Sequence, residues 1–156
     1  DGTLERASDQ TIAEFRETME TFQQEISKTE NKLERHLNSV KAMQTALSRA
    51  SEEDTALVRQ LHEARITLLD IQKQMEGSEA KQEIGERTQP SPSSRLYVGY
   101  SGLSSTYGPT PMHIETVENG KQELNTIQND LNQFAENVMP GLKQAFEQID
   151  APPIEE

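Results

Sequence analysis

The side chains that could bind a metal or act as a general base are three histidines, His36, His62 and His113, and many carboxylates. No two histidines stand three or four residues apart and the chain has no cysteine, so no helix face gathers two nitrogen or sulfur ligands. His36 falls on an apolar stripe, where a packed histidine is favoured over a ligand or base. His113 stands in the first turn of a helix and is expected at the surface. The histidines therefore predict neither a metal site nor a catalytic site.

The carboxylates are too numerous to indicate a catalytic pair. The chain has 27 acidic and 15 basic residues, a net charge of −12, so some acidic pair will lie at almost any separation. A glycosidase pair also needs a cleft and a shifted pKa, which a sequence does not show. There is no glycine-rich phosphate loop, nucleophile elbow or zinc motif. We therefore expect no enzymatic activity and no cofactor, and we interpret the charges as keeping the protein soluble.

Charge and hydropathy disfavour several classes of partner. Binding to nucleic acid requires clustered lysine and arginine, and no basic stripe is present. The same acidity disfavours an anionic membrane surface. No apolar run approaches the roughly 20 residues that span a bilayer, and no signal-peptide core is present. Without cysteine, the sequence gives no redox indication of the compartment.

One cluster differs from ordinary helix-bundle sequence. All three tyrosines fall within residues 97–107, next to a single arginine. This composition departs from that of a bundle core, so the cluster is a candidate interaction patch. The alternative is that it closes one end of a helical bundle. The candidate residues are Arg95, Tyr97, Tyr100 and Tyr107.

The elements that would position this cluster are long helices. Only 32% of the residues are hydrophobic and 4% aromatic, which suits narrow helical packing better than a wide core. Residues 8–50 carry a heptad stripe without internal glycine or proline, and nine of its eleven positions are apolar. Thr11 with Glu14 resembles a capping box, with Ser8 as an alternative cap. The stripe positions are Ile12, Phe15, Met19, Phe22, Ile26, Thr29, Leu33, His36, Val40, Met43 and Leu47.

A second helix is predicted over residues 52–76, with Ser51 and Asp54 as its capping box. The short linker makes it an antiparallel neighbour of the first helix. It stops before Gly77, and the polar, Gly/Pro/Ser-rich residues 77–93 predict a flexible loop. Its stripe positions are Leu57, Leu61, Ala64, Leu68, Ile71 and Met75.

Two further elements complete the predicted bundle. Residues 94–104 have apolar side chains to bury and predict a short helix or a packed turn. Residues 111–149 predict a long helix that starts at a Thr110 cap with Pro111 in its first turn and kinks near Pro140. Its stripe runs through Val117, Gly120, Leu124, Ile127, Leu131, Phe134 and Val138, then Leu142, Ala145 or Phe146, and Ile149.

Taken together, residues 1–156 predict a single all-α domain. We expect an antiparallel bundle of three long helices and one short helix, with coiled-coil-like packing. The first helix is longer than the second, so the hairpin leaves part of its stripe uncovered. The last helix is long enough to cover that part.

Short motifs in the C-terminal part of the chain support a resemblance. The chain resembles the C-terminal helical region of large secreted sortilin-like proteins with BNR repeats, a group classed with glycosyl hydrolases. The motifs are Arg95-Leu96, Gly108-Pro109-Thr110, and Met139-Pro140-Gly141-Leu142 followed by Ala151-Pro152.

The resemblance implies that one or two β-propellers precede this region in a parent protein. Any glycan chemistry would belong to those propellers, so it assigns no catalytic residue here. It implies an extracytoplasmic location, periplasmic or secreted. The chain begins at Asp1 rather than Met, and we expect it to be processed or part of something larger.

Two functions follow as expectations. The first is a non-catalytic accessory domain that docks on the upstream β-propeller of its own parent chain or forms a homo-oligomer. The alternative is a stand-alone coiled-coil scaffold or adaptor that self-associates. An enzyme in its own right is the least favoured interpretation.

Overall fold

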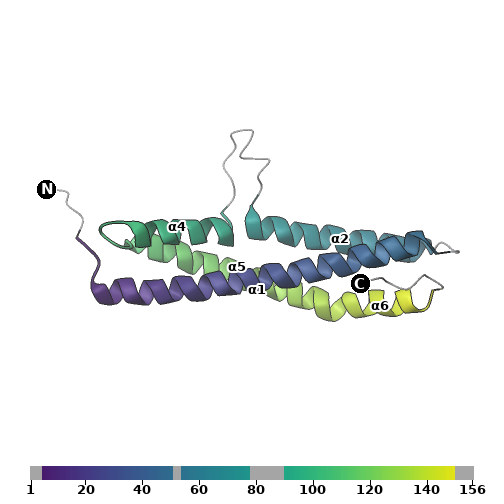
Figure 1. Ribbon diagram of the computed structural model, residues 1–156. Coiled ribbons are helices and arrows are strands. Elements are labelled where there is room, and N and C mark those ends of the chain that lie inside the picture. The colour runs from purple at the N-terminus through teal and green to yellow at the C-terminus, as the bar shows by residue number, and fades with distance from the viewer. Residues whose placement is uncertain (1–4, 51–53, 78–89, 150–156) are drawn as a thin grey trace, which may run out of the picture. The chain divides into compact units, whose positions relative to one another are not determined.

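The computed structural model describes residues 5–50, 54–77 and 90–149. Every regular element within these ranges is an α-helix, and the helices pack against one another, which confirms the predicted all-α helical bundle (Figure 1). The described helices are α1 (Asp9–Ser48), α2 (Thr55–Glu76), α4 (Pro92–Ser104), α5 (Pro111–Asn137) and α6 (Met139–Glu147).

The contacts divide the chain into two compact units. Unit 1 comprises residues 1–29 and 73–127, and unit 2 comprises residues 30–72 and 128–156. Unit 1 contains the first part of α1, the last turn of α2, all of α4 and most of α5. Unit 2 contains the rest of α1, most of α2, the end of α5 and α6. Each unit therefore packs its helical segments around an apolar interior.

In unit 1, α4 lies against α1 and runs in the opposite direction (Figure 1). The backbone N–H of Ala7, just before α1, donates to the carbonyl of Tyr107, just after α4, at 2.7 Å. Further along α1, Met19 lies against Gly99 near the middle of α4. The first part of α1 is thus covered by α4 as well as by α5. The sequence predicted only the last helix as its cover.

In unit 2, helices α1 and α5 run in the same direction. Lys32 Nζ donates to Asn132 Oδ1, and one turn further on the ring of His36 meets the ring of Phe134 edge-on, with centroids 5.9 Å apart. Residue numbers increase together along both helices. Helix α2 comes next in the chain and runs back along α1 in Figure 1, so the two helices are antiparallel neighbours, as predicted.

The heptad stripes form the interior of both units. Nine of the eleven predicted stripe positions of α1 are buried, and the other two, Ile12 and His36, are half-buried. All six positions predicted on α2 are buried. On α5 the stripe is buried from Val117 to Phe134. Because each long side chain on a stripe removes apolar area from water, these positions supply most of the stabilisation.

The prediction for Val138 is wrong. This side chain is 38% exposed, and the buried residue is its neighbour Met139. Helix α5 ends at Asn137, and α6 starts at Met139 with Pro140 in its first turn. Pro140 has no N–H to donate to the preceding turn and its ring crowds that turn, so the helix is interrupted there. The interruption shifts the buried face by one residue, after which Leu142 is again buried.

The first helix begins at the alternative cap, and the second begins later than predicted. The Oγ of Ser8 accepts from the Thr11 N–H at 3.1 Å, so Ser8, the alternative, caps α1. The Oδ1 of Asp54 accepts from the Leu57 N–H at 3.0 Å, and α2 begins at Thr55 rather than at residue 52; Ser51, the other residue of the predicted box, lies outside the described residues. Serine and aspartate are both strong N-cap residues, so sequence alone did not rank these candidates.

The two edges of the flexible loop predicted over residues 77–93 fall within the described residues, and at its C-terminal edge residues 92 and 93 are helical instead. Gly77 ends α2 in the left-handed region, at φ 80°, and its N–H donates to the Lys73 carbonyl at 2.8 Å. Residues 78–89 lie outside the described residues. Helix α4 already begins at Pro92, two residues before the predicted start of the short helix. Helix α4 begins earlier than predicted because Ser91 caps it and Pro92 occupies its first turn.

Candidate interaction surface

Residues 90–114 form an almost uncharged segment, called here the charge-poor segment. Arg95 is its only Asp, Glu, Lys or Arg, whereas these residues make up 27% of the whole chain. It contains three of the six exposed large hydrophobic side chains among the described residues: Tyr97 at 78%, Met112 at 58% and Tyr107 at 44% exposure. Low charge combined with exposed aromatic and methionine side chains is typical of interaction surfaces.

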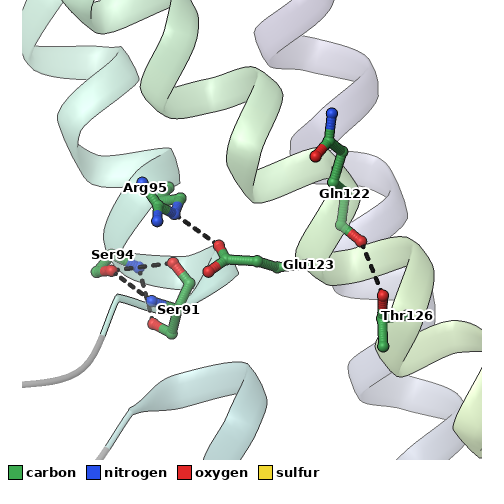
Figure 2. A network of polar contacts seen from close by, with 6 residues as sticks. All are labelled: Ser91, Ser94, Arg95, Gln122, Glu123 and Thr126. Carbon is green, nitrogen blue, oxygen red and sulfur yellow. Dashed lines mark hydrogen bonds and ion pairs between the residues drawn. The ribbon is translucent and has the colours of Figure 1, made fainter.

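The segment is held in place first by the N-terminal cap of α4. Ser91 and Ser94 form a reciprocal capping box: the Ser94 N–H donates to Ser91 Oγ at 3.2 Å, and the Ser91 N–H donates to Ser94 Oγ at 2.9 Å (Figure 2). Pro92 occupies the first helical turn, where its missing N–H has no cost. Ser91 is buried, so its polar groups depend on these bonds.

Replacing Ser91 by alanine should lower the free energy of unfolding by about 1 kcal/mol, because a helical N–H loses its acceptor. The matched control is Thr126→Ala, shown in the same view. The Thr126 hydroxyl only donates to the Gln122 carbonyl within α5, at 3.3 Å (Figure 2). Its removal should be neutral or slightly stabilising. Urea titration of both variants checks the contrast, and equal effects would contradict the role of the cap.

An ion pair and a glycine join α4 to α5. Arg95 Nε donates to Glu123 Oε1 at 2.6 Å, with both side chains largely covered (Figure 2). Gly120 lies under the arginine: a Cβ there would come within 3.0 Å of Arg95 Cβ and 2.8 Å of Phe22 Cζ. The single charge of the charge-poor segment is therefore paired within unit 1. Gly120, which lies on the predicted stripe, is thus at a close approach of helices.

Two glycines on α4 allow a second close approach. A Cβ on Gly99 would stand 2.4 Å from Met19 Sδ and 2.7 Å from Val117 Cγ2. A Cβ on Gly102 would stand 2.7 Å from His113 Cγ. The glycine face of α4 thus points into unit 1, and the opposite face of the helix points to solvent. Two glycines three residues apart, in a helix whose one charged side chain is Arg95, are the sequence signal of this packing.

The four residues of the predicted patch divide into two pairs. Arg95 and Tyr100 face neighbouring helices: Arg95 pairs with Glu123, and the Tyr100 hydroxyl donates to Gln23 Oε1 on α1. Tyr97 and Tyr107 have exposed side chains. The structure therefore places two of the four in packing contacts and leaves two tyrosines at the surface.

The expectation that His113 is exposed is wrong. Its ring is half-buried against Gly102, and it takes part in capping α5. The Thr110 N–H donates to His113 Nδ1 at 2.9 Å, while the His113 N–H donates to Thr110 Oγ1 at 3.3 Å. Thr110 is the cap that the sequence predicted. The ring was missed because glutamate or glutamine, rather than histidine, is usual at this position of a capping box.

His36 lies on the predicted stripe of α1, half-buried in unit 2. Its Nε2 is buried and has no hydrogen-bond partner among the described residues. Burial lowers the pKa of His36, and nearby positive charges lower that pKa further. These charges are Lys32, Lys143 and Arg35. The neutral imidazole is therefore the form that fits the folded protein.

This environment makes stability depend on pH. The unfolded chain takes up a proton on His36 near its ordinary pKa of about 6.5, whereas the folded protein does so only at lower pH. The unfolded state then binds more protons, so stability falls as pH drops below about 6.5. His36→Leu should reduce this loss. Unfolding titrations of both proteins between about pH 7 and pH 5 measure it. An identical pH dependence in both would contradict the assignment.

The described residues contain no group of three or more metal-ligating side chains arranged to hold an ion. None of the described helices is long and apolar enough to cross a membrane. In comparisons with known proteins, no family model, no curated protein and no solved structure matches the chain.

Proposed function

We propose that this chain is a non-catalytic helical module that works by docking. The observation that carries the proposal is the charge-poor segment, which displays Tyr97, Tyr107 and Met112. Tyrosine and methionine supply large contact areas, and the absence of unpaired charge lowers the cost of desolvation on binding. Helix α4, which carries Tyr97, is held against its neighbours by its ion pair and glycine contacts, and its first turn is capped.

The resemblance to sortilin-like BNR-repeat proteins suggests where the module acts. We infer that it belongs to the C-terminal part of a larger extracytoplasmic protein and docks on the β-propeller that precedes it. Glycan hydrolysis, if the parent performs it, would then reside in the propeller. The module would contribute positioning or assembly.

A second candidate is a stand-alone scaffold that self-associates. It is favoured by the hydroxyl-rich outer face of α4, where Ser94, Tyr97, Ser101 and Ser104 are all exposed. Hydroxyl groups both donate and accept hydrogen bonds, so such a face can pair with its own copy.

The size of the native protein in its source cells separates the two candidates. An antibody raised against this chain should detect a band far above 17.6 kDa if the chain is a module of a larger protein. A single band at 17.6 kDa, without a larger precursor, would contradict the module and favour the self-associating scaffold.

A further inference from the structure

The outer face of α4 is the most distinctive part of the charge-poor segment. Ser94, Tyr97, Ser101 and Ser104 recur at steps of three and four residues, so they share one side of the helix, and all four are exposed. This set is called the tyrosine–serine face. It lies opposite the glycine side that packs into unit 1. It contains no charged residue.

Hydrogen bonding within the helix leaves this face with a defined set of donors and acceptors. The Ser101 hydroxyl donates to the Val98 carbonyl at 2.7 Å, so its oxygen remains available as an acceptor. The Ser94 hydroxyl donates to the Ser91 carbonyl at 2.9 Å as part of the cap. Tyr97 is 78% exposed, and its hydroxyl can donate outward. A tyrosine donor and a serine acceptor thus stand four residues apart, about 6 Å along the helix.

From this arrangement we propose that the tyrosine–serine face binds the same face of a second copy of the chain. Two α4 helices crossing antiparallel about a two-fold axis place each Tyr97 opposite Ser101 of the other copy. Each tyrosine hydroxyl then donates to a serine oxygen, twice by symmetry. A two-fold interface requires such a self-complementary surface. The proposal rests on the docking function proposed above and assigns this face of the segment to a second copy of the chain rather than to the β-propeller.

The distribution of charge favours this face over the other surfaces of the protein as the place where two copies meet. The chain carries a net charge of −12, so copies that meet through their acidic faces repel. The tyrosine–serine face brings no carboxylate of its own into the contact, and the one arginine nearby is paired with Glu123. Repulsion between surrounding carboxylates remains and is screened by salt. Association through this face should therefore strengthen as salt concentration rises.

The size of the face predicts a weak dimer. A helix of 13 residues is about 20 Å long, and one face of it covers less than the roughly 800 Å² per partner of a standard interface. We expect a dissociation constant in the micromolar range or above. In a larger parent protein, such a contact would act together with others.

Sedimentation equilibrium of the full 156-residue chain tests the proposal, at protein concentrations from about 1 µM to about 1 mM and at low and high salt. The wild type should form dimers that tighten with salt. Tyr97→Glu places a charge at the two-fold contact and should weaken dimerisation by about tenfold or more. The matched control is Ile66→Glu on α2, another exposed apolar residue, which should dimerise as the wild type does. Circular dichroism verifies that both variants keep their helices.

Three outcomes would overturn the proposal: a wild type that stays monomeric throughout, a dimer that weakens with salt, or a Tyr97→Glu variant that dimerises as the wild type does. None of these measures whether the chain belongs to a larger protein. Failure of the dimer is thus distinguishable from failure of the docking module, which depends on the native size.

Discussion

A Leu61→Asp variant is expected to be unfolded at room temperature. Leu61 is fully buried in unit 2, at 0% exposure, and Leu131 on α5 is buried as deeply. The substitution removes a buried apolar side chain and places a carboxylate among apolar neighbours, which offer it neither a hydrogen bond nor an opposite charge. Its cost is comparable to the whole stability of a small domain, about 5–15 kcal/mol. Leu131→Asp should have the same effect.

Circular dichroism and thermal melting measure this loss. The matched control is Ile66→Asp, which adds the same charge to the same helix at a side chain that is 52% exposed. The control should keep its helicity and nearly all of its melting temperature. If Leu61→Asp proved as stable as the parent, the heptad register assigned to α2 would be wrong.

A Gly120→Leu variant should lose about 3 kcal/mol of stability, because the added side chain must enter a filled space. Even its Cβ would lie 2.8 Å from Phe22 Cζ, and Phe22 is itself buried. Its outer atoms would also displace the stem of Arg95 and disturb the ion pair with Glu123. The effect should appear in the midpoint of urea unfolding.

The control for this substitution should change stability in the opposite direction. Apart from its chain neighbours and the backbone of its own helix, Gly141 on α6 has no heavy atom within 4 Å of the position that a Cβ would take. Gly141→Ala should therefore stabilise the protein by about 0.5–1 kcal/mol, because alanine loses less backbone entropy in a helix. A stabilising Gly120→Leu would refute the close approach of α5 to Phe22.

Much of the fold was predictable from sequence because a helix turns regularly. On α1 and α2, apolar residues repeat in steps of three and four, so each position fixes the direction of the next and the buried face follows. Gly77 and Thr110 marked helix ends for equally local reasons. Glycine tolerates a positive φ at the end of a helix, and threonine accepts a helical N–H at its beginning.

The mistaken predictions depend on contacts distant in sequence or on competing local choices. Val138 is exposed because Pro140 interrupts the helix. The apolar pattern does not show by how many residues the buried face shifts there. His113 was placed at the surface because its neighbour in unit 1, Gly102, belongs to another helix. Of the candidate surface, the tyrosine cluster was visible in sequence. Which tyrosines remain exposed was decided by the glycine side of α4.

Site-specific photo-crosslinking tests the central claim, docking through the charge-poor segment, most directly. A photoreactive phenylalanine derivative would replace Tyr97 in the native protein in its source cells, with the same group at Ile66 as the matched exposed position. The account predicts crosslinks from position 97 to a defined protein surface, in the same parent chain or in a second copy, and little from position 66. Crosslinks from position 66 with none from position 97 would contradict it.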